Sequence, residues 1–204
     1  MTADEFAALL VFATAMSFTP GPNTLLATAL AANFGLRRAS RFVVAVPAGW
    51  TVMMLASGLG LGALVVALPW LRGGLKAIGI AYLVWLAWKL ARTRAFAPAS
   101  APHLAVGFWQ GVGLQFVNIK AWMLALALAA GWVASAAGHA SANPGERLAI
   151  VCAVMAVFAL TSNAAYALAG SLLRRVLAQG DRLLWFNRAM AALLLATALW
   201  MTAL

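Results

Sequence analysis

Charged residues are scarce in this sequence. Only 9% of its 204 residues are Asp, Glu, Lys or Arg, and only 4 residues are acidic, whereas about a quarter of a soluble domain is charged. With 65% apolar residues, the chain cannot coat a water-exposed surface. The net charge of +10 would otherwise suggest a nucleic-acid partner, but the apolar excess argues against one and indicates an integral membrane protein.

Groups that commonly carry out catalysis or bind metals are also few. A single cysteine, Cys152, excludes an intrachain disulfide and a cysteine metal cluster. The two histidines, His103 and His139, fall in expected loops, and neither a pair of facing aspartates nor a His-Glu-x-x-His motif occurs within a span. We therefore expect no enzyme, no metal site and no cofactor.

Long uncharged stretches are what the sequence does contain. A transmembrane helix needs about 20 apolar residues. We expect an all-α integral membrane protein with six transmembrane helices, within residues 6–36, 42–71, about 75–90, about 106–135, about 148–173 and 183–204. A proline-containing linker, 91–105, divides this single transporter domain (1–204) into halves of about 1–95 and 104–204, each with three spans.

The basic residues are distributed unevenly between the expected loops. With the amino terminus outside, the inside loops hold ten: Arg37, Arg38, Arg41, Lys89, Arg92, Arg94, Arg174, Arg175, Arg182 and Arg188. The outside loops hold three: Arg72, Lys76 and Arg147. Because cytoplasmic loops of membrane proteins carry the excess of Lys and Arg, we expect both termini to lie outside.

The first expected span contains Thr19-Pro20-Gly21-Pro22-Asn23. Proline removes a backbone donor and clashes with the preceding turn, and glycine is a weak helix former, so the helix should unwind there. Unpaired backbone groups persist at membrane depth only when buried in protein or lining a watery cavity. A packing kink is the alternative, but the polar neighbours favour a substrate site: Ser17, Thr19, Asn23 and Thr24.

Lys120 is the only charge well inside an expected span. It follows Gln115 and Asn118 and lies about 14 and 15 residues from the two ends of that span. Intramembrane ionisable residues are costly and usually functional, whereas the alternative of reaching an interface needs a nearby span end. We therefore expect Lys120 to anchor the substrate, and Trp122 is a candidate wall of the site.

The two interruptions align at an offset of 98 residues, which places Ser17–Pro20 on Gln115–Asn118. Since each half has an odd number of spans, the halves must enter the membrane from opposite sides. This is the inverted repeat of many secondary transporters, whose substrate site lies where interrupted helices meet. We expect two inverted three-helix repeats in which helices 1 and 4 are broken.

The broken helices also predict the kind of cargo. A half-helix amino terminus offers free amides and partial positive charge, which suit a carboxylate. No Asp or Glu lies inside a span, so a cationic cargo side chain would find no partner. We expect a small neutral amino acid, with its carboxylate at Lys120 and the amides of residues 20–23. Its ammonium group would meet backbone carbonyls and Asn118 or Asn163, although Asn163 could equally bond between helices.

The expected partners are this small molecule and the lipid bilayer. Six of the tryptophans lie near predicted span ends, where tryptophan anchors helices at the interface. Gly58 and Gly62 form a small-residue stripe in the second span. Such stripes are typical of close helix packing, and this one could also serve a homodimer.

These motifs resemble the LysE/RhtB family of amino-acid exporters over essentially the whole chain. Thr19-Pro20-Gly21-Pro22 resembles the first-span signature, residues 81–89 the end of the third span, and Asn118-Ile119-Lys120-Ala121 an Asn-Pro-Lys-Ala motif. Residues 114–118 and 167–170 are most similar to the cysteine/O-acetylserine branch. The resemblance implies proton-driven export of amino acids or derivatives, of the cysteine/O-acetylserine or homoserine/threonine type, across a bacterial inner membrane.

Two departures from the family pattern leave alternatives open. Ile119 stands in place of the usual proline, so helix 4 should bend less than in relatives. The lack of intramembrane acids leaves proton coupling to Lys120, a peripheral acid or the substrate itself. Export of basic amino acids is one alternative function. A non-transporting membrane subunit is another, and it predicts that the two breaks are packed shut without a cavity.

Overall fold

A computed structural model describes residues 1–58, 61–96, 106–136, 139–140 and 143–203, and nearly all of them are helical. The expected helical class is confirmed. The helices are α1 (Ala3–Phe18), α2 (Pro22–Phe34), α3 (Leu36–Gly58), α4 (Leu61–Ala67), α5 (Pro69–Ala91), α6 (Phe108–Val117), α7 (Ile119–Leu128), the π-helix η1 (Ala129–Ala134), α8 (Pro144–Leu177) and α9 (Arg182–Ala203). Two-residue strands, β1 (Ser135–Ala136) and β2 (His139–Ala140), pair antiparallel before α8.

Four of these helices are long and apolar enough to cross a membrane: α3, α5, α8 and α9. A fifth span is obtained if α6 is counted together with the continuous helix Ile119–Ala134. The helices α1 and α2 have 16 and 13 residues, which is short of the roughly 20 that a single span needs. The chain is thus a multi-pass membrane protein, and the six-span inverted repeat stays a prediction.

Several helices extend beyond the expected spans. The stretch 42–71 contains most of α3, all of α4 and the start of α5, because Pro69 begins a new helix at its first position, where proline is well tolerated. α8 has 34 residues and is about 51 Å long, which exceeds the hydrocarbon core. Its last turn carries Arg174 and Arg175, the charges expected at the inner edge.

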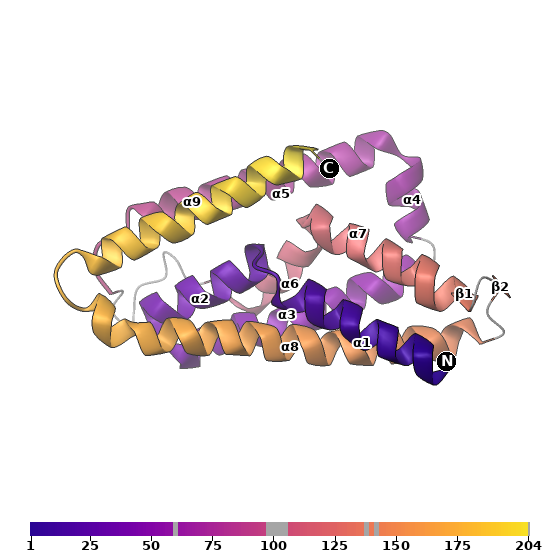
Figure 1. The fold of residues 1–204 in the computed structure, drawn as a ribbon. Helices are drawn as coiled ribbons and strands as arrows, with labels where there is room; N and C mark the ends of the chain where they lie inside the picture. Colours follow the sequence, from indigo (N-terminus) through magenta and orange to yellow (C-terminus); the bar gives the residue numbers. More distant parts are fainter. Residues whose placement is uncertain (59–60, 97–105, 137–138, 141–142, 204) are drawn as a thin grey trace.

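Figure 1 shows how the helices are arranged. α1 and α2 follow one another along α8, and α5 and α9 lie side by side as a separate layer. α3 packs against both α6 and α8. The turn into α3, the end of α5 and the connection from α8 to α9 all lie at the left end of this view, so the ten basic residues expected inside gather at one end of the protein.

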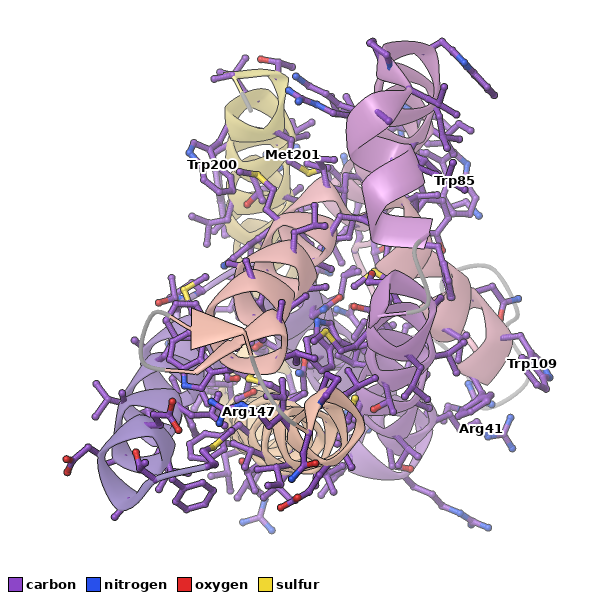
Figure 2. All side chains as sticks on the ribbon, turned by 90° about the vertical axis from the view of Figure 1, so that its right-hand side faces the viewer. Arg41, Trp85, Trp109, Arg147, Trp200 and Met201 are labelled. Atoms are coloured by element: carbon purple, nitrogen blue, oxygen red, sulfur yellow. The ribbon has the colours of Figure 1, made fainter. Side chains whose placement is uncertain are left out.

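Lipid-facing and buried side chains separate clearly in the view from the other end (Figure 2). Trp85, Trp109 and Trp200 project away from the helices and are 45%, 78% and 49% exposed, while Met201 is fully buried. Between helices in a membrane, close packing and hydrogen bonds provide most of the stability, because lipid is as apolar as the helix surfaces. Glycine permits such packing at Gly79, where a β-carbon would overlap the Val117 carbonyl oxygen of α6.

The two glycines expected to pack closely do so within the chain. A β-carbon on Gly58 would lie 2.9 Å from Leu148 Cδ2, and one on Gly62 would lie 2.9 Å from Leu126 Cδ2. These contacts join the α3–α4 region to α8 and α7. Packing inside one chain therefore accounts for the small-residue stripe, and the homodimer stays a prediction.

A hydrogen-bonded pair of buried asparagine side chains links helices at the basic end of the protein. Asn33, at the end of α2, and Asn187, in α9, exchange side-chain hydrogen bonds of 2.7 and 3.0 Å. Asn187 Nδ2 also donates to the Thr93 carbonyl oxygen beyond α5, at 3.1 Å. Both asparagines are almost fully buried, where paired amides are costly to separate.

An ion pair holds the opposite end. Arg147 of α8 contacts both carboxylate oxygens of Glu5 in α1, at 3.0 and 3.1 Å, and donates to the Trp132 carbonyl oxygen at 2.6 Å. The Arg147 hydrogen bond, followed by the Thr2 backbone amide, lowers the pKa of Glu5 to about 2. Because this pKa is lowered, the ion pair contributes its full stability above the ordinary value of 4.5 and loses it as pH falls towards 2.

Candidate functional site

The first interruption of the helices lies between α1 and α2. The chain leaves the helix after Phe18, runs extended through Thr19 and Gly21, and re-enters a helix at Pro22. The Gly21 amide donates to Thr24 Oγ1 at 2.9 Å. The hydroxyl of Tyr166, in α8, donates to the Phe18 carbonyl oxygen at 2.9 Å. The side chains of Thr24 and Tyr166 thus form hydrogen bonds with backbone groups that have no helical partner because of the break.

The second interruption is a single extended residue, Asn118, between α6 and α7. The two helices are bent by 69° there, so a sharp bend forms with Ile119 in place of proline. The Trp122 indole N–H, one turn into α7, donates to the Phe116 carbonyl oxygen at 2.7 Å. Phe116 is the residue that aligns with Phe18 at the offset of 98. At each break, therefore, an aromatic side chain (Tyr166 or Trp122) donates a hydrogen bond to the carbonyl oxygen of the equivalent phenylalanine.

The two interruptions meet inside the protein. A β-carbon on Gly21 would lie 3.3 Å from Lys120 Nζ, so the missing side chain leaves room for the lysine amine. Asn23 of α2 and Gln115 of α6 exchange side-chain hydrogen bonds of 2.9 and 3.2 Å. Gln115 is fully buried. The first turn of α2 and the second break are therefore joined directly.

A cavity of about 80 Å³ lies where the breaks meet. It has room for about five water molecules, which is on the scale of a small amino acid. Eight of the expected site residues line it: Ser17, Thr19, Gly21, Pro22, Asn23, Asn118, Lys120 and Asn163. α3 and α8 supply its other walls.

Three buried polar atoms at this cavity have no hydrogen-bond partner. They are the indole nitrogen of Trp50 and the side-chain oxygens of Asn118 and Asn163. Asn163 Nδ2 donates to the Ala159 carbonyl oxygen of its own helix at 2.8 Å. Only the side-chain oxygen of Asn163 therefore lacks a partner among the described residues. Buried polar atoms without partners are rare in proteins and require an explanation. A bound ligand with complementary groups would provide one.

A second cavity, of about 340 Å³, lies on the α9 side of the same breaks. Thr19, Gly21 and Lys120 line both cavities, and Pro20 lines only the second. The remaining walls are mainly apolar: Leu25, Leu193, Ala196, Thr197 and Trp200. Lys120 therefore lines both the smaller and the larger cavity.

Lys120 is the only charged residue lining either cavity. It is half-buried, and the one ion pair within the described ranges, that of Glu5 with Arg147, does not include it. Lys76 lines neither cavity and donates to the Thr202 carbonyl oxygen, near the end of α9, at 2.7 Å. An unpaired positive charge inside the protein makes an anionic group the natural ligand.

Two expected site residues lie outside both cavity linings. Gln115 holds Asn23, and Trp122 supports the second break. Conversely, the cavity includes residues that the sequence did not single out, among them Val46, Trp50 and Met155. Trp50 lies near the middle of α3, away from the helix ends where tryptophan anchors to the interface, and that depth is the one sequence signal that could have indicated it.

Comparisons with known proteins identify relatives of this chain. The family described as LysE type translocator matches residues 14–203. A cysteine/O-acetylserine efflux protein of Klebsiella pneumoniae is 32% identical over 193 residues, covering 93% of this chain and 94% of that protein. The Escherichia coli O139:H28 protein of the same name is 31% identical over 199 residues, covering 96% of each. The Salmonella choleraesuis protein of that name is 40% identical over 105 residues, about half of each chain. No solved structure is significantly similar.

Proposed function

The chain belongs to the LysE type translocator family, and we propose that it exports small neutral amino acids or their derivatives from the bacterial cytoplasm. The observation that carries this proposal is the cavity between the two helix breaks, which combines one unpaired cation with two unpartnered side-chain oxygens. These groups complement a zwitterion. Relatives that are named cysteine/O-acetylserine efflux proteins support the same class of cargo.

In the proposed complex, the amino-acid carboxylate binds Lys120 at the amino-terminal ends of α2 and α7. The helix termini add partial positive charge to that of the lysine. The ammonium group binds the side-chain oxygens of Asn118 and Asn163, which lack partners within the described part of the chain. Each charged group of the ligand would thereby replace its lost hydration with protein contacts.

The same charges argue against a basic cargo. None of the residues lining the two cavities is acidic, so the side chain of lysine or arginine would have no anionic partner there. A buried charge without a partner is strongly disfavoured. Export of basic amino acids is therefore the weaker alternative.

The function of a non-transporting subunit is likewise less well supported than that of a transporter. That function predicts helix breaks that are packed shut, whereas about 80 Å³ of open volume lies between them and a larger chamber adjoins it. A substrate in either cavity would contact Lys120, which lines both. The inverted three-helix repeat, with both termini outside, would let the two halves move against each other and open the site alternately to the two sides of the membrane.

We further propose that the proton gradient drives export by antiport. Glu5 is ionised throughout the neutral range because its pKa is about 2, so this carboxyl does not carry the coupled proton. Lys120, the other peripheral acids and the substrate itself remain the groups through which coupling can act. Proton movement in reconstituted vesicles would measure it.

Expression in a bacterial strain that lacks its own amino-acid exporters tests the cargo. We expect the protein to raise resistance to excess cysteine, O-acetylserine or threonine, and to leave resistance to arginine analogues unchanged. The opposite pattern would contradict the neutral cargo. Transport by the purified protein in vesicles separates a transporter from a non-transporting subunit.

A further inference from the structure

Trp50 contributes a buried hydrogen-bond donor to the cavity that nothing in the protein uses. Its side chain is 5% exposed, it lines the 80 Å³ cavity from α3, and its indole nitrogen has no partner among the described residues. Two other tryptophans show the usual arrangement, because Trp122 donates to the Phe116 carbonyl oxygen and Trp132 to that of Glu5. An unpaired buried donor costs free energy, so its persistence at a cavity points to a ligand.

The other polar groups of the cavity are matched by the ends of an amino acid. Lys120 suits the carboxylate, and the oxygens of Asn118 and Asn163 suit the ammonium group. Trp50 is then the remaining donor, and it is uncharged. It comes from α3, one turn after Val46, whereas the anion-binding groups come from the helix breaks of α2 and α7. A neutral donor away from the breaks suits a neutral acceptor on the cargo.

We propose that Trp50 determines specificity by donating its indole N–H to an acceptor on the side chain of the exported amino acid. This inference rests on the proposed function. The acceptor is an oxygen of a hydroxyl or ester group. An aliphatic side chain of the same size would leave the N–H unpaired, and sites built around such a donor reject ligands that lack the matching group.

Threonine and valine are the sharpest pair of probes, because they have the same shape and differ in one hydroxyl group. Purified protein in vesicles would be assayed for uptake of each labelled amino acid. We expect the wild type to transport threonine at least about tenfold more efficiently than valine. Trp50→Phe removes the N–H and keeps an aromatic ring, so it should lower the ratio of threonine to valine transport to about one.

Trp85→Phe is the matched control, since this indole lies on the lipid-facing side of α5 and is 45% exposed. It should keep the wild-type preference for threonine. Elution of purified Trp50→Phe at the wild-type volume in size-exclusion chromatography would show that this variant is folded.

Two results would overturn the inference. The first is a wild type that transports threonine and valine equally well. The second is a Trp50→Phe variant that loses both to the same extent, which would assign the indole to the common carboxylate or to packing. Failure of the wild type to transport any amino acid would instead contradict the proposed function, and the inference with it.

Discussion

The two helix breaks differ in chemistry and in extent, since three residues leave the helix at the first and one at the second. The first contains two prolines and a glycine and has no charge, whereas the second has neither proline nor glycine and is followed by Lys120. In the first, proline itself prevents a continuous helix. In the second, a bend of 69° coincides with contacts from outside the break, namely the indole of Trp122 and the close approach of Gly79 to the Val117 carbonyl.

This difference suggests a division of roles. The first break provides space, because Gly21 has no side chain where the lysine amine lies. The second break provides the charge that fills the space. The Asn23–Gln115 hydrogen bonds then hold the two breaks in register.

Filling the space at the first break should have a large effect on export. In Gly21→Leu the β-carbon alone would lie 3.3 Å from Lys120 Nζ, and the rest of the side chain would displace the amine. Overpacking of this kind typically costs about 1–3 kcal/mol, so we expect export to fall by about tenfold or more. Gly113→Leu in α6 is the control, because nothing lies within 4 Å of its β-carbon position. Equal export by the two variants would contradict the role of Gly21.

The aromatic donors should differ in importance between the breaks. Trp122→Phe leaves the Phe116 carbonyl unpaired at a break without proline, at a cost of about 1–3 kcal/mol. Tyr166→Phe affects a break that proline already imposes, so its effect should be smaller. Thermal unfolding of the purified proteins would compare them, and we expect a Tm decrease of roughly 4 °C or more for Trp122→Phe and less for Tyr166→Phe.

Trp50→Phe controls for the lost volume in that comparison, since this tryptophan is equally buried but its N–H makes no hydrogen bond in the described protein. A Tm decrease that is as large for Trp50→Phe as for Trp122→Phe would show that packing, and not the hydrogen bond, supports the second break.

Proline at the second break should have the smallest effect. Ile119 is the first residue of α7, where the amide has no helical partner and proline is tolerated. Asn118 is already extended, with φ −88° and ψ 98°, as a residue before proline prefers. We therefore expect Ile119→Pro to keep export within about threefold of the wild type.

Met123→Pro, inside the same helix, should abolish export because interior proline costs about 3 kcal/mol or more. If Ile119→Pro were as damaging as Met123→Pro, the second break would not have the geometry described.

The parts of the site that sequence could predict are those set by local chemistry. Pro20, Gly21 and Pro22 together disfavour a continuous helix, and Lys120 is conspicuous because it lies far from any other charge. Trp50 and Met155 could not be predicted with them, because they reach the cavity only through the packing of α3 and α8 against the breaks.

The same limit applies to the fold. Hydropathy located the apolar segments, and the helical class follows from it. The Asn33–Asn187 hydrogen-bonded pair and the Glu5–Arg147 ion pair join residues more than a hundred positions apart. Such pairs depend on three-dimensional packing that no local sequence pattern encodes.

The most direct test of the central claim compares Lys120 with Lys76, a lysine that lines neither cavity. Uptake of labelled O-acetylserine into vesicles would be measured for Lys120→Met, which loses the cavity charge, and for Lys76→Met, which loses a contact to the Thr202 carbonyl near the end of α9. We predict that Lys120→Met is indistinguishable from protein-free vesicles while Lys76→Met transports like the wild type. Full transport by a correctly inserted Lys120→Met would contradict the account.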